Sequence, residues 1–89
     1  MKNIKINDTQ VECSHEIKTD ESHHTTIHVT AKIGDVETRH AMTIGAVDQP
    51  LPENYGQAEL QRDLDAARQK CASMAESKLR AKQLAANLE

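Results

Sequence analysis

Apolar and polar residues alternate along the first half of the chain, and this period of two predicts strands. The clearest case is the run from Gln10 to Lys18, in which every second residue is suited to face a core. Those core-facing residues are Val11, Cys13, His15 and Ile17. We therefore expect a half-buried strand here, with one face toward the core and one toward water.

A turn is expected just before this strand, at Asn7-Asp8, because both residues favour turns. A two-residue turn would pair Ile6 with Thr9 and Ile4 with Val11, which places the apolar side chains on one face. A bulge within one longer strand is the alternative. Residues 1–8 thus form either a separate strand or the first part of a longer one.

The strongest local signal is a hairpin over Thr25–Ile44, with its turn at Gly34-Asp35. Gly followed by Asp suits a two-residue hairpin turn. The resulting register separates apolar from polar residues and sets Lys32 opposite Glu37, a favourable cross-strand pair. On the other face it pairs Ile33 with Val36, Ala31 with Thr38, Val29 with His40, and Ile27 with Met42. We expect Ile27, Val29, Ala31 and Ile33 to face the core.

The second half of the chain, from Asn54 to Asn87, changes to a helical pattern. Asn54 followed three residues later by Gln57 suggests a capping box at the helix start. No Gly or Pro interrupts the chain from Gln57 to Asn87, and good helix formers dominate. We therefore predict one long helix after the strands.

One side of this helix carries an apolar stripe roughly 100° wide. Its members are Leu60, Leu64, Ala67, Cys71, Met74 and Ala75. Lys78 and Lys82 take the next positions, so the stripe covers about four turns. Because that length matches one small sheet, the last three turns should extend past it.

The elements together predict a single α+β domain over residues 1–87, with the element order β-β-(β)-β-α. Its core is an antiparallel meander sheet of three or four strands, with one long C-terminal helix packed on one face. Leu88-Glu89 resembles the restriction-site remnant that precedes an affinity tag, and we exclude it from the domain. Aromatic residues make up 1% of the chain, so the core must consist of small aliphatic side chains.

The distribution of charged and apolar residues along the chain narrows the kinds of partner that the protein could bind. Residues 1–56 hold five bases and nine acids, and residues 57–87 hold six bases and four acids. Without clustered bases, nucleic acid is a poor partner. No signal peptide and no membrane-length apolar run is visible, so we expect a cytoplasmic protein with no membrane partner. In that compartment Cys13 and Cys71 should be buried, reduced thiols.

The histidines are the residues that most suggest a metal. His23, His24 and His28 form the closest cluster, but they lack a second pair of ligands at zinc spacing. His15 and His40 should flank Val29 on neighbouring strands, about 10 Å apart, which is too far to share a metal. We therefore predict no metal site.

Catalytic chemistry has no better support in the sequence. We expect one open, solvated face of the sheet to carry Glu12, Glu16, His28 and Arg39. Charged residues on such a face are most often solvated side chains without a catalytic role. A chain this short encloses little of a pocket. We therefore predict that the protein is not an enzyme and binds no cofactor.

The predicted overhang of the helix leads to a functional hypothesis. An isolated three-turn helix end is barely stable in water, so it should pack on something. Beyond the first stripe, Ala72, Ala75, Leu79 and Ala86 form a second one, rotated by about 80°. The candidate interaction face comprises Ala72, Leu79, Leu84 and Ala86.

These observations favour a small non-enzymatic protein–protein interaction module that forms a homodimer, the commonest symmetric assembly. One alternative is a small accessory regulator that binds nucleic acid or a nucleic-acid-binding protein. The other is a His-rich metal-binding protein.

Overall fold

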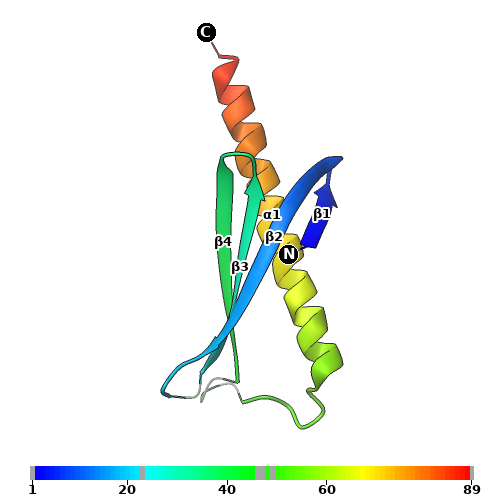
Figure 1. Ribbon diagram of the computed structural model, residues 1–89, viewed down its shortest axis with the longest axis vertical. Helices are drawn as coiled ribbons and strands as arrows, with labels where there is room; N and C mark the ends of the chain where they lie inside the picture. Colours follow the sequence, from blue (N-terminus) through cyan, green and yellow to red (C-terminus); the bar gives the residue numbers. More distant parts are fainter. Residues whose placement is uncertain (1, 23, 46–47, 49, 89) are drawn as a thin grey trace.

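The computed structural model describes residues 2–22, 24–45, 48 and 50–88. Four antiparallel strands form one sheet in chain order, and a single helix follows them (Figure 1). The elements are β1 (Lys2–Ile6), β2 (Thr9–Thr19), β3 (Thr25–Ile33), β4 (Val36–Ile44) and α1 (Gln57–Ala86). The predicted fold class, an α+β meander sheet with one long C-terminal helix, is confirmed, and the sheet has four strands.

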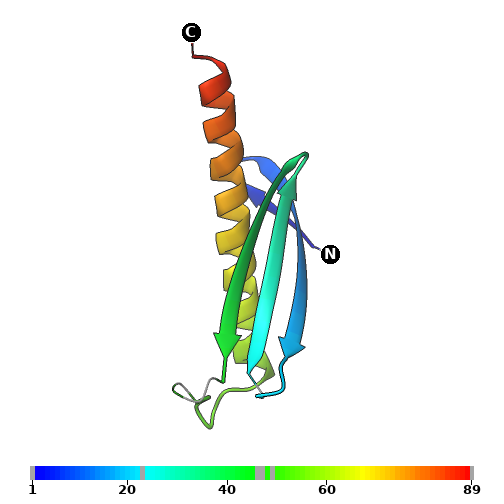
Figure 2. The ribbon, with the colours of Figure 1, turned by 90° about the vertical axis from the view of Figure 1, so that its left-hand side faces the viewer.

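The helix covers one face of the sheet and leaves the other face open (Figure 2). It lies mainly over β3 and β4, with fewer contacts to β2 and β1. The molecule is elongated, at 54 × 23 × 19 Å, because α1 is longer than the strands it covers. The fold therefore has two layers and one uncovered sheet surface.

The turn between β1 and β2 is the predicted two-residue turn. Asn7 and Asp8 both adopt positive φ, at 48° and 66°, as a hairpin turn of this length requires. Ile4 pairs with Val11 and Ile6 with Thr9. A separate first strand is thus confirmed, and the alternative of a bulge in one longer strand is wrong.

The β3–β4 hairpin has the predicted register at every pair from Ile27↔Met42 to Ile33↔Val36. Gly34 takes a φ of 60°, where a glycine is unstrained. Ile27, Val29 and Ala31 are fully or almost fully buried under the helix. The core adds residues from β1, β2 and α1, namely Ile6, Val11, Cys13, Leu64, Ala67, Cys71, Ala72 and Ala75.

The start of α1 differs from the prediction, because the helix is capped by Gly56 and not by Asn54. The backbone N–H of Gly56 donates to the Glu59 carboxylate at 2.9 Å, so Glu59 performs the role expected of Gln57. Upstream, the Tyr55 backbone N–H donates to the carbonyl of Pro52 at 3.0 Å. Gly56 is extended, at φ −133° and ψ −160°, so the helix begins after it and Asn54 lies in the preceding turn.

The buried side of α1 also differs in part from the predicted stripe. Met74 is 40% exposed, so its assignment to the stripe is wrong, whereas Ala72, Arg68 and Glu76 are buried. The helix lies over β3 and β4, and the sheet continues from there toward β2 and β1 but ends at β4. The buried arc is therefore shifted toward β2 and away from the side that carries Met74.

Beyond the apolar stripe, two lysines extend the contact of α1 with the sheet. Lys78 Nζ donates to the carbonyl of Glu37 at 3.3 Å, and Lys82 Nζ contacts Asp35 Oδ2 at 2.9 Å. From Arg80 to Leu88 every residue is exposed, and Figure 1 shows this end of α1 beyond the β3–β4 turn. The helix therefore overhangs the sheet as predicted, by a shorter segment than expected.

Candidate functional site

The predicted interaction face does not form one open surface. Ala72 is completely buried against the sheet, and Leu79 is half-buried. Leu84 and Ala86 are exposed, with Leu84 65% exposed. The sheet side of the helix thus includes Ala72, and Leu84 is the large apolar member of the face that remains accessible.

A different row of side chains, apolar except for Ser77, is open on α1. It consists of Met74, Ser77, Ala81 and Leu84, which we call the exposed helix stripe. The spacing of three, four and three residues is that of successive a and d positions in a coiled coil. Leu88, within the expected tag remnant, continues the spacing. The heptad spacing from Met74 onward was the sequence signal for this stripe.

The exposed helix stripe begins on the β4 side of the helix. Met74 and Ala81 lie four residues before and three residues after Lys78, so all three are neighbours on the helix surface. Lys78 reaches β4. Contacts to the other side of the sheet come from the opposite flank of α1, where Arg68 bonds His15 of β2. A partner on this part of the stripe would therefore also lie beside β4.

Arg68 is a buried cation that the sequence analysis missed. Its NH1 donates to Asp65 Oδ1 at 3.1 Å and its NH2 to His15 Nδ1 at 2.9 Å, while its Nε has no partner within the described residues. Since an arginine only donates, His15 must accept through Nδ1 and carry its proton on Nε2. This contact also places the His15 side chain toward the helix, as predicted. The two histidines flank Val29, with His15 on β2 and His40 on β4.

The two thiols are buried and unpaired, as predicted. Burial raises the pKa of Cys13, and the proximity of Cys71 raises it further. Cys71 Sγ lies 3.4 Å from the carbonyl of Thr38, whose hydroxyl donates to the Cys71 carbonyl at 2.9 Å. Cys71 therefore links the helix to β4, and the raised pKa of Cys13 disfavours a reactive thiolate.

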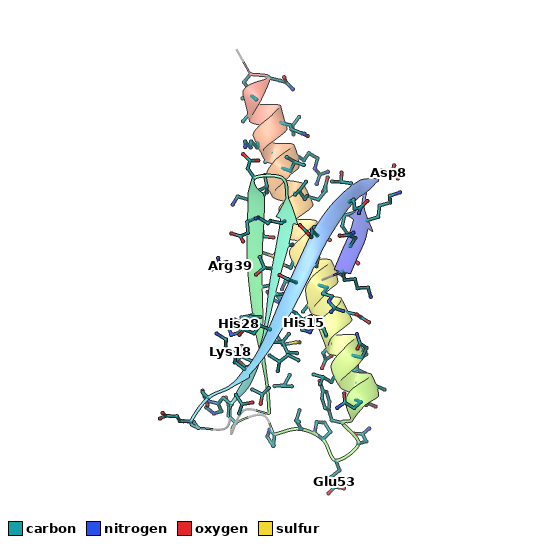
Figure 3. All side chains as sticks on the ribbon, viewed as in Figure 1. Asp8, His15, Lys18, His28, Arg39 and Glu53 are labelled. Carbon is teal, nitrogen blue, oxygen red and sulfur yellow. The ribbon has the colours of Figure 1, made fainter. Side chains whose placement is uncertain are left out.

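The open face of the sheet carries the predicted group of polar residues. Its shallow depression, about 450 Å³ in volume, is lined by Glu16, Lys18, His28, Thr30 and Arg39, together with Val29, His40 and Ala41. Figure 3 labels Lys18, His28 and Arg39 of this group. Lys18 pairs with Glu16 at 3.6 Å and Arg39 with Glu37 at 3.8 Å, each along its own strand. These side chains are largely exposed, and the depression is open to solvent.

The expectations about a metal site and a membrane-spanning helix can be compared with the described residues. No three His, Cys, Asp or Glu side chains there come close enough to hold a metal ion, and His23 lies outside the described residues. No described helix has the length and apolar character needed to cross a membrane. No protein-family model, curated protein or solved structure matches the chain.

Proposed function

We propose that this protein is a small non-enzymatic protein–protein interaction module that works as a homodimer. The observation that carries the proposal is the exposed helix stripe. Two large apolar side chains on α1 are exposed within the described residues, Met74 at 40% and Leu84 at 65%. Helical partners pack against such rows at a and d positions.

The energetics require more than the stripe alone. Fully burying a side chain such as Met74 or Leu84 gains about 1.5–3 kcal/mol, so two copies together would gain roughly 6–12 kcal/mol. Association costs about 4–15 kcal/mol in lost freedom of motion. The two ranges overlap, and both side chains are already partly covered. A stable homodimer therefore needs a second contact region besides the stripe.

Binding of nucleic acid has weaker support than protein binding. The basic residues of the helix end are the natural candidates for phosphate contacts, but Lys78 and Lys82 both contact the β3–β4 hairpin. Arg80 pairs with Glu76 at 3.4 Å. Bases engaged in this way do not form the open cluster that phosphate binding needs.

Light scattering coupled to size exclusion, at tens of micromolar protein, tests the proposal. The wild-type chain should elute with the mass of a dimer, and Leu84→Glu should raise the dimer dissociation constant by at least about a hundred-fold. Gln83→Glu is the matched control, because it adds the same charge next to Leu84 but outside the stripe. A monomer mass for the wild type would refute the proposed function.

A further inference from the structure

We draw no further inference here: the strongest candidate, the long outer edge of β4, which pairs with no described strand other than β3 on its inner side, carries none because nothing in the structure shows what covers it.

Discussion

A charge placed at the centre of the sheet should unfold this domain. Val29 is 1% exposed, pairs with His15 on one side and His40 on the other, and its carbonyl lies 3.6 Å from Cys71 Sγ. Val29→Asp would bury a carboxylate under α1 with no cation to pair with it. The change would also remove the valine side chain that packs at this position. The variant isolates the effect of burial because the backbone at this position is ordinary strand.

The expected loss exceeds what the domain can tolerate. At about 0.05–0.15 kcal/mol per residue, a chain of this size has a free energy of unfolding of roughly 4–13 kcal/mol. Losing the buried methyl groups costs about 2 kcal/mol, and an unpaired buried charge costs several more. The combined loss is comparable to or larger than the lower half of the range for the free energy of unfolding. We therefore expect the variant to be largely unfolded or its melting temperature to fall by more than about 20 °C.

Thr30→Asp is the matched control one residue along the same strand. Thr30 points to the open face, between Ser14 and Arg39, where a carboxylate is solvated and lies near a base. Its cost should stay within about 1 kcal/mol, the span of strand preference. Far-UV circular dichroism during urea and thermal unfolding measures both variants. Equal stability of the two proteins would refute the assignment of Val29 to the core and the register on which it depends.

Two further predictions concern titratable groups. Cys13 and Cys71 should react with a soluble thiol reagent about a hundred-fold or more slowly in the native protein than in urea, because both are buried and the pKa of Cys13 is raised; rapid labelling of the folded chain would contradict this. The hydrogen bond from Lys82 lowers the pKa of Asp35 below its ordinary 3.8, so this contact stabilises the native state above that pH and is lost as the pH falls through the lower folded value. The unfolding curves of wild type and Lys82→Met should therefore converge once the pH is below the lowered pKa of Asp35 in the folded protein, and a difference that persisted there would show that Lys82 acts otherwise.

The strands could be predicted well because their signals are local. A period of two, together with turn residues at fixed positions, determines which side of each strand is buried, so the pairs around Gly34 and Asn7 follow from neighbours in the chain. The cap of α1 depended on a turn made by Pro52 and Tyr55, which no pairwise capping pattern contains. Gly56 has no side chain to mark it as a cap.

The residues of α1 that are buried could not be predicted from the helix sequence alone, because they depend on the sheet beneath it. Whether Ala72 or Met74 is covered is decided by the direction in which the sheet continues beneath α1, and the helix period alone does not contain that direction. Arg68 was missed because a long side chain can bury its stem when its head finds partners on another element, here His15. Of the candidate face, Leu84 and Ala86 are exposed, and both the interaction face and the homodimer stay predictions.

The order of elements has a consequence for synthesis of the chain. All four strands precede α1, so during translation the sheet emerges first, with Ile27, Val29 and Ala31 still uncovered. The helix covers them only after the segment as far as Ala75 has left the ribosome. During that interval the nascent chain exposes both an apolar sheet face and an open strand edge, the features that favour aggregation and attract chaperones. Truncation before Ala75 should therefore yield an insoluble product, whereas loss of residues beyond Lys82 should leave a folded domain.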